Sequence, residues 1–304
     1  MKIKNKSVAA ELGLLFVTVI WGGSFVVVKN TTASIPTNYI IAIRFGIASI
    51  LMLLFFFKRI RKIDARSIKS GALIGVILYV AYYLQTVGIK YTTAGNNAFL
   101  TAIYVVLVPF LYWLIRNIKP DAYNILSALI CIAGIGFLSL HTGFTMNMGD
   151  SLSLLCGIAF SAQIVGISIL TEKSDPILLA FTQCAVTAII AFAVALCTES
   201  FPAKLVTSSI LALIYMGVFS TMIAMVLQTV CQKYIPPSRA SLIMSLESLF
   251  GTYFGIVFLN EALTLKTFIG FLLIFAAILI SETKLSFLKH KKHDSTVEEP
   301  SSLV

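Results

Sequence analysis

The chain has 304 residues, of which 58% are hydrophobic and only 12% are charged, and its formal net charge is +10. Soluble globular domains carry about 25% charged residues, so this composition excludes an ordinary soluble protein. The basic excess does not indicate nucleic-acid binding, because the Lys and Arg residues gather between apolar stretches, where they face anionic lipid.

Ten apolar stretches are each long enough to cross a membrane core of ~30 Å as a helix, which takes roughly 20 residues. In chain order they are Leu12–Asn30, Asn38–Phe57, Ile68–Ile89, Ala94–Ile115, Ala122–Leu140, Ser151–Thr171, Pro176–Cys197, Thr207–Val230, Ala240–Leu259 and Leu265–Ile280. The first stretch exceeds the roughly 7–15 residues of a signal-peptide core, so we expect it to be retained as a helix. The sequence therefore predicts an all-α, multi-pass integral protein of the bacterial plasma membrane.

The positive charges predict the orientation of these spans. With both termini inside, 18 of the 23 Lys and Arg residues fall on inner segments and span ends, four fall on the outer side, and Arg44 lies within a span. Because cytoplasmic loops are enriched in Lys and Arg, we expect an N-in, C-in topology. Residues 1–11 are then a cytoplasmic N-terminus, and the polar residues 284–304 are a disordered cytoplasmic tail.

An eight-residue string occurs twice, as LQTVGIKY at Leu84–Tyr91 and as LQTVCQKY at Leu227–Tyr234. Six of its eight positions are identical, and the copies lie 143 residues apart. From the first copy to the end of the second there are five apolar stretches, and this odd number inverts the second copy in the membrane. We therefore predict two inverted five-helix repeats, residues 12–140 and 151–283, which is an architecture of alternating-access transporters.

Upstream of the string the repeat continues with an offset of 139 residues. Trp21–Ser24 aligns with Phe160–Gln163, and Arg44 aligns with Gln183. Both alignments place polar side chains at matching depths in the two halves.

With these features the chain resembles the EamA-type transporters of the drug/metabolite transporter superfamily. The marks are Trp21–Phe25 (WGGSF), Arg44-Phe45, Pro109, Leu246-Glu247 and Leu259–Thr264 (LNEALT), and the resemblance extends from Leu12 to Ile280. It departs from the family at Ser248, where a proline is frequent, and at Asn260, where a glycine is frequent. The resemblance implies export or exchange of small metabolites, such as amino acids, through a central cavity that opens to one side at a time.

Two charged residues lie well inside the predicted spans, and each has two interpretations. Glu247 is either a protonatable coupling site or contact for a substrate amine, or a structural carboxylate held by hydroxyls such as Ser245 or Ser248. Arg44 either binds a substrate carboxylate or locks its span against backbone carbonyls of a neighbour. The helical rise places the two residues about 11 Å apart along the membrane normal, which disfavours a direct pair.

Other polar and aromatic residues complete the candidate sites. The substrate-cavity candidates are Trp21, Ser24, Tyr82, Thr101, Tyr104, Gln163, Ser245 and Glu247, because polar groups inside a membrane mark interior sites. The gate or structural candidates are Arg44, Gln85, Gln183 and Gln228. Gln85 and Gln228 of the repeated string are predicted at opposite mouths of the path, as gate hydrogen bonds or as contacts that hold helices together.

Two local features predict departures from straight helices. Small residues after Trp21 either break the first span or let a neighbouring helix approach closely. Pro109 removes a backbone donor and is expected to bend the fourth span.

No GxxxxGK[ST], HExxH or GxSxG motif is present, so we expect neither ATP hydrolysis nor another enzymatic activity. We expect no catalytic residue, no metal site and no cofactor, and leave coupling to protons open. The favoured function is a secondary transporter that exports or exchanges a small, amino-acid-like metabolite by alternating access. An importer or uncoupled facilitator on the same fold comes second, and a channel is a distant third. The expected partners are a small solute and the lipid bilayer, and a monomer is compatible with the sequence.

Overall fold

The computed structural model describes residues 2–139, 146–202 and 205–283, and within these ranges it contains helices and no strand. The elements are α1 (Lys2–Thr31), α2 (Thr37–Phe55), α3 (Phe57–Ile60), α4 (Ala65–Tyr91), α5 (Ala94–Thr101), α6 (Tyr104–Arg116), α7 (Ala122–Ser139), α8 (Met148–Leu170), α9 (Pro176–Thr198), α10 (Thr207–Tyr215), the π-helix η1 (Met216–Ile223), α11 (Ala224–Gln232), α12 (Pro237–Ser245), α13 (Glu247–Leu259) and α14 (Leu265–Thr283). The predicted tail, residues 284–304, lies outside the described residues.

Helix length and composition confirm a multi-pass membrane protein. Among the described residues, eight continuous or end-to-end helical segments are apolar and long enough to cross a membrane. They are Lys6–Thr31, Thr37–Phe55, Ala65–Tyr91, Ala94–Arg116, Met148–Leu170, Pro176–Thr198, Thr207–Gln232 and Pro237–Leu259. Helices α7 and α14 contain shorter apolar segments, Ala122–Ile135 and Leu265–Ile280.

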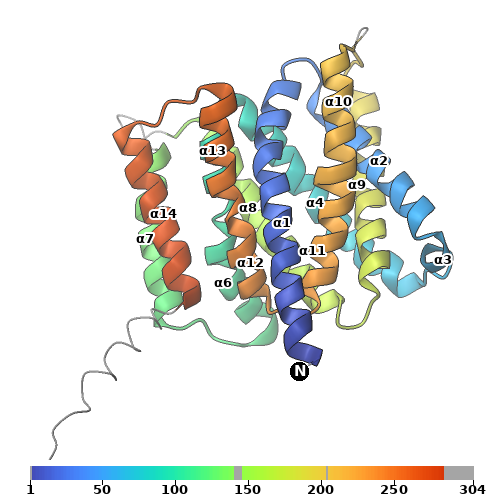
Figure 1. Ribbon diagram of the computed structural model, residues 1–304, viewed down its shortest axis with the longest axis horizontal. Coiled ribbons are helices and arrows are strands. Elements are labelled where there is room, and N and C mark those ends of the chain that lie inside the picture. Colours follow the sequence, from blue (N-terminus) through green and yellow to red (C-terminus); the bar gives the residue numbers. More distant parts are fainter. Residues whose placement is uncertain (1, 140–145, 203–204, 284–304) are drawn as a thin grey trace, which may run out of the picture.

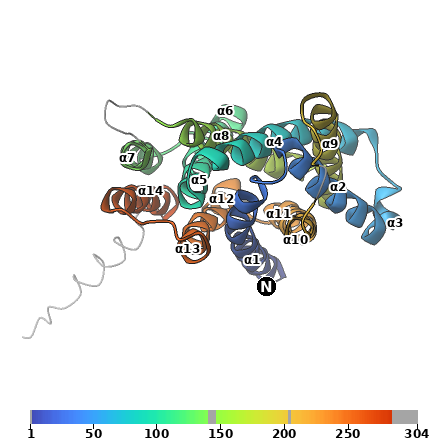
Figure 2. The same ribbon diagram turned by 90° about the horizontal axis from the view of Figure 1, so that it is seen from above.

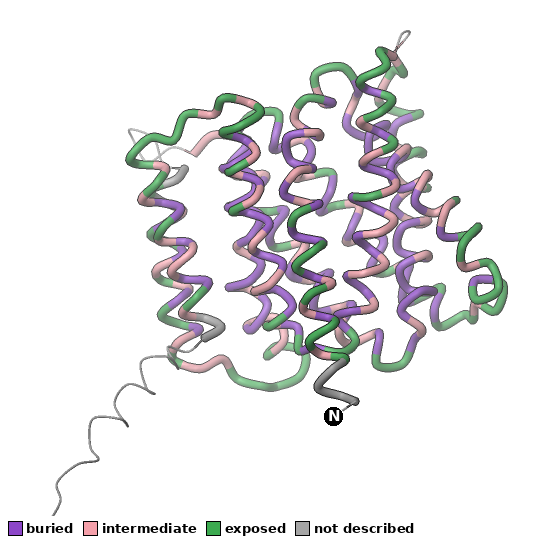
Figure 3. The backbone as a smooth tube through the Cα atoms, in the orientation of Figure 1, coloured by how far each residue is buried: buried purple, intermediate pink, exposed green. Residues whose placement is uncertain are grey.

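The helices run roughly alongside one another, with α1 in the middle of the bundle (Figure 1). Helix α1 packs against α11, α12 and α13, and α7 packs against α14 at one edge (Figure 2). Helices α2 and α9 pack together at the opposite edge. Buried and exposed residues alternate along the helices (Figure 3). Large apolar side chains such as Leu54 and Leu114 are exposed. Exposed apolar faces of this kind suit contact with lipid chains.

The fourth and ninth spans are each broken in the middle. The first break separates α5 from α6 at Ala102 and Ile103, and the second separates α12 from α13 at Leu246. The turn at the first break is tightened, since the amide of Val105 bonds the carbonyl of Ala102 at 3.1 Å. Pro109 lies within α6, after this break, so the break does not coincide with the proline.

The ninth span breaks without a proline. Ser248 stands in the first turn of α13, and its hydroxyl donates to the carbonyl of Ser245 at 2.8 Å across the break. A side-chain hydroxyl thus satisfies one of the carbonyls that a helix end leaves free.

Helix α1 is continuous from Lys2 to Thr31, so the predicted break after Trp21 is wrong and close packing is correct. A Cβ atom on Gly22 would lie 2.3 Å from the Cβ of Phe250, and one on Gly251 would lie 2.8 Å from that of Ala98. The glycines let the backbones of α1 and α13 approach to a distance that no larger residue permits.

Candidate functional site

A cavity lies among the central helices and encloses about 540 Å³ of space, including its mouth. Both halves of the chain contribute to its lining. The predicted residues that line it are Trp21, Ser24, Arg44, Tyr82, Gln85, Tyr104, Gln163, Gln228 and Glu247. The three other candidates, Thr101, Gln183 and Ser245, lie outside the lining.

Arg44 of α2 forms one polar wall of the cavity and is only 2% exposed. Its Nε donates to the hydroxyl of Thr221 at 2.9 Å, and its Nη2 donates to the hydroxyl of Ser220 at 2.8 Å. The guanidinium also lies 4.7 Å from the ring centre of Tyr82, a cation–π contact. Arg44 is therefore held by hydroxyls and an aromatic ring, and the predicted contact with backbone carbonyls is wrong.

Ser220 connects three helices at this wall, and sequence reasoning missed it. Its hydroxyl accepts a hydrogen bond from Ser24 at 2.6 Å, and its carbonyl accepts one from the indole Nε1 of Trp21 at 2.9 Å. Ser220 belongs to the π-helix η1, in which the wider backbone turn changes carbonyl pairing. π-Turns of this kind occur frequently at functional sites. No proline or glycine pair in the sequence signals this one.

Glu247 forms a second polar wall and is 5% exposed. Its Oε1 accepts a hydrogen bond of 3.1 Å from the phenol of Tyr104. Each of these two residues is the first residue of the helix that follows a break. A carboxylate at the start of α13 also lies at the positive end of the helix dipole.

The expected hydroxyl partners of Glu247 bond elsewhere. Ser245 donates to the carbonyl of Leu242 at 2.7 Å, and Ser248 donates to that of Ser245. Both serines satisfy helix carbonyls, and the phenol of Tyr104 takes the role predicted for them.

Arg44 and Glu247 do not pair with each other. The ion pairs among the described residues are Arg59–Asp175, Arg116–Glu172 and Arg239–Glu11. The cavity therefore contains a cation and a carboxylate that are each held by neutral groups.

A cluster of amides lies on the side of the second half. The amide of Gln228 donates to that of Gln163 at 3.2 Å, and Gln163 also lies 3.4 Å from Gln183. Gln183 in turn donates to Thr229 at 3.1 Å. Gln183, which aligns with Arg44 in the repeat, is thus a neutral residue that bonds other neutral side chains.

The remaining candidates are placed as follows. Gln85 and Gln228, predicted at opposite mouths, line the same cavity, and Gln85 is the more exposed of the two. The hydroxyl of Thr101 lies 3.8 Å from the sulfur of Cys156, behind the cavity wall. No group of three or more potential metal ligands occurs in the part of the chain that the structure describes.

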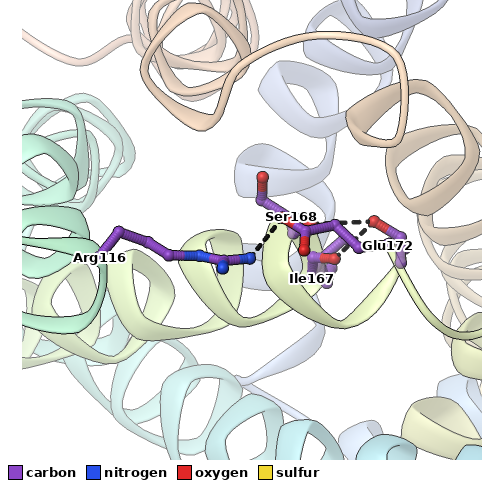
Figure 4. A network of polar contacts seen from close by, with 5 residues as sticks. Arg116, Ile167, Ser168 and Glu172 are labelled. Atoms are coloured by element: carbon purple, nitrogen blue, oxygen red, sulfur yellow. Dashed lines mark hydrogen bonds and ion pairs between the residues drawn. The ribbon is translucent and has the colours of Figure 1, made fainter. Parts of the chain in front are cut away.

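Ion pairs and capping carboxylates join the two halves of the chain outside the cavity. Each ion pair links a residue of the first half to one of the second, as Arg116 at the end of α6 does with Glu172 beyond α8 (Figure 4). Glu261 accepts hydrogen bonds from the amides of Ala94 and Gly95 at 2.6 and 3.0 Å, and so caps α5. Glu199 caps α2 through the amide of Asn38 at 2.9 Å. These polar contacts join the halves in addition to the helix packing between them, as between α4 and α8.

Comparison with known proteins gives a consistent result. The sequence profile of the EamA-like transporter family matches the chain twice, over residues 8–140 and over residues 147–283. An uncharacterised transporter of Archaeoglobus fulgidus is 36% identical over 277 residues, which cover 91% of this chain and 87% of that protein. The uncharacterised transporter YvbV of Bacillus subtilis is 24% identical over 276 residues, covering 89% and 90% of the two chains. A protein of known crystal structure shares the fold, with a TM-score of 0.69, 16% identity, and coverage of 93% of this chain and 99% of the other.

Proposed function

The chain belongs to the EamA-like transporter family, and we propose that it is a secondary transporter that exports or exchanges a small, amino-acid-like metabolite by alternating access. The observation that carries this proposal is that a guanidinium and a carboxyl group line the walls of one cavity. Arg44 and Glu247 both line the cavity, and neither has an ion-pair partner among the described residues.

The chemistry of the two walls fits a zwitterion. A guanidinium has five N–H donors, and hydroxyls of Ser220 and Thr221 take only two of those of Arg44. Its remaining donors are free for a carboxylate, which binds guanidinium groups strongly. The Oε2 of Glu247 has no donor among the described residues and is free for an ammonium. Trp21 and Tyr82 add apolar surface for a side chain.

The same proposal includes ten spans in two inverted repeats, and the helix bounds support it. At an offset of 143 residues, α6 (Tyr104–Arg116) corresponds to α13 (Glu247–Leu259) end for end. In the part of the chain that the structure describes, Asn117 and Asn260 are the two non-glycine residues with positive φ. They differ by the same offset and end these two helices. The double match of the family profile also supports two units.

The N-in, C-in topology is part of the proposal. The start of α1 and the end of α14 lie at the same end of the bundle (Figure 1). Helix α3 lies toward this end too (Figure 1), and the segment in and after it contains the basic residues Lys58, Arg59, Arg61 and Lys62. An excess of Lys and Arg marks the cytoplasmic side.

Proton coupling at Glu247 completes the proposed mechanism. A buried carboxyl that lacks a cation can alternate between a protonated state and an ionised state that binds an ammonium. Binding of the substrate amine and of a proton would then exclude each other, which is the requirement for exchanging substrate against protons. The mechanism uses no metal or organic cofactor, and one chain contains the whole cavity.

A ligand screen on the purified protein tests the substrate class. We expect neutral amino acids to raise the melting temperature, because a ligand that binds only the folded state stabilises it. The matched amines and carboxylic acids, which each lack one charge, should stabilise the protein less. Equal stabilisation by all three classes, or by none, would reject the zwitterion site.

A further inference from the structure

A second pocket lies at the ends of three helices, away from the central cavity. Arg66 and Ser70 line it from the first turns of α4, Arg116 from the end of α6, and Glu172, Lys173 and Ser174 from the turn after α8. It encloses about 730 Å³, including its open mouth. The central cavity shares none of these residues.

The pocket carries an excess of positive charge. Arg116 is paired with Glu172 at 2.5 Å, which leaves the charges of Arg66 and Lys173 without an ion-pair partner among the described residues (Figure 4). Asp64, the nearest carboxylate in sequence to Arg66, caps α4 by accepting a hydrogen bond from the amide of Ser67 at 3.0 Å. Bonds from Ser67 are the main reason that the pKa of Asp64 is lowered, and Arg66 contributes least.

An unsatisfied hydroxyl also lies in this pocket. The side chain of Ser174 is 9% exposed, and its Oγ has no hydrogen-bond partner. Leaving a buried polar atom unpaired is unfavourable, so a ligand oxygen that pairs with this hydroxyl removes that penalty. The guanidinium of Arg66, the ammonium of Lys173 and the unpaired hydroxyl of Ser174 form a donor set that binds phosphate.

The surroundings of the pocket favour a phosphate that is attached to a lipid. Ile169 and Leu170 of the last turn of α8 form its apolar side. Ile68 and Ile115, which are close in sequence to lining residues of α4 and α6, are 47% and 54% exposed on membrane-spanning helices. A headgroup in the pocket can therefore keep its acyl chains in the bilayer.

We propose that this pocket binds the phosphate headgroup of an anionic phospholipid. Basic pockets between membrane helices recognise such headgroups. Because the lining comes from α4 and α6 of the first half and from the turn after α8 of the second, a bound headgroup also joins the two halves in the arrangement seen here. The proposal concerns a site separate from the substrate cavity and does not depend on what the protein transports.

The experiment uses the full-length protein in detergent with phosphatidylglycerol, phosphatidylcholine of the same acyl chains, or inorganic phosphate. Native mass spectrometry counts bound lipid, and thermal unfolding measures its effect. We expect phosphatidylglycerol to bind and to raise the melting temperature, while phosphatidylcholine does not. Inorganic phosphate that reproduces the full effect would overturn the assignment to a lipid.

Two variants with matched charge localise the site. The double variant Arg66→Gln and Lys173→Gln should bind phosphatidylglycerol about thirtyfold more weakly, since each basic residue contributes about 1 kcal/mol. The control variant Lys58→Gln and Lys62→Gln removes two exposed charges at the same end of the bundle, outside the pocket, and should bind as the wild type does. Equal weakening in both variants would contradict a specific pocket.

Ser174→Ala tests whether the hydroxyl contributes to lipid binding in addition to the positive charges of the pocket. Without lipid this variant should be at least as stable as the wild type, because the hydroxyl has no partner to lose and its unpaired burial is unfavourable. With phosphatidylglycerol it should bind more weakly. Unchanged lipid binding would show that the hydroxyl of Ser174 does not bind the headgroup.

Discussion

The phenol of Tyr104 donates a hydrogen bond of 3.1 Å to the carboxylate of Glu247, and the two residues lie 143 residues apart. This is the offset of the repeated eight-residue string, so the residues occupy equivalent places in the proposed repeats. Equivalent residues can touch only near the axis that relates two repeats. The contact therefore marks the centre of the molecule, where both halves reach the cavity.

Glu247→Gln should reduce transport at least tenfold, because the amide keeps the shape of the side chain but cannot bind an ammonium as a charged partner. The remaining transport should also lose its pH dependence. Rates measured in proteoliposomes over a pH series test both effects. Tyr104→Phe, which removes the donor but keeps the carboxylate, is the matched control and should retain pH-dependent transport. Wild-type rates for Glu247→Gln at every pH would assign the residue a structural role.

Arg44→Gln should raise the half-saturating substrate concentration roughly ten- to hundredfold, since a hydrogen bond to a charged group contributes about 1.5–3 kcal/mol. Thr221→Val is the control, because it removes a contact of Arg44 while the charge stays. Kinetics and melting temperature are measured together. A role limited to locking α2 would lower the stability of both variants and leave the half-saturating concentration unchanged.

Gly22→Ala should destabilise the protein by about 1–3 kcal/mol, the usual result of overpacking. Its Cβ would meet Phe250 and the backbone of α13. Gly46→Ala is the matched control, since a Cβ at Gly46 has nothing within 4 Å. Thermal unfolding in detergent should therefore lower the midpoint for Gly22→Ala alone. Equal midpoints would show that α1 and α13 can move apart at no cost.

Cysteine labelling in intact cells tests the topology, in a background with the exposed Cys197 replaced by serine. Ser200→Cys, in the exposed loop after α9, should react with a membrane-impermeant maleimide from outside. Lys62→Cys, exposed between α3 and α4, should react only after the membrane is permeabilised. The reverse pattern would place the termini outside.

The helical membrane fold was largely predictable, because each membrane-spanning helix requires a long apolar stretch that is visible in the sequence. Most of the polar cavity lining was also predictable, because polar residues within spans, such as Arg44 and Gln163, are unfavourable in contact with lipid and therefore face the interior. Tyr104 was among the candidates, but its contact with Glu247 was not foreseen. The shared offset of 143 was the signal that could have revealed it.

What the sequence could not reveal depends on the exact path of the backbone. Ser220 bonds several helices at once because it lies in the π-turn of η1. Its carbonyl accepts a hydrogen bond from Trp21, and its hydroxyl accepts one from Arg44. Serine is common in membrane helices, so nothing distinguished this one. Similarly, Gly22 and Gly23 fit both a break and a close contact, and only the neighbouring helix decided between them.

Counterflow in proteoliposomes tests the central claim most directly. Vesicles are loaded with an unlabelled neutral amino acid, and uptake of the labelled compound is followed for the wild type and for Glu247→Gln. The account predicts saturable exchange by the wild type, competition by other neutral amino acids but not by matched amines or acids, and loss of exchange in the variant. Absence of exchange over the whole amino-acid panel, or exchange that Glu247→Gln leaves intact, would contradict it.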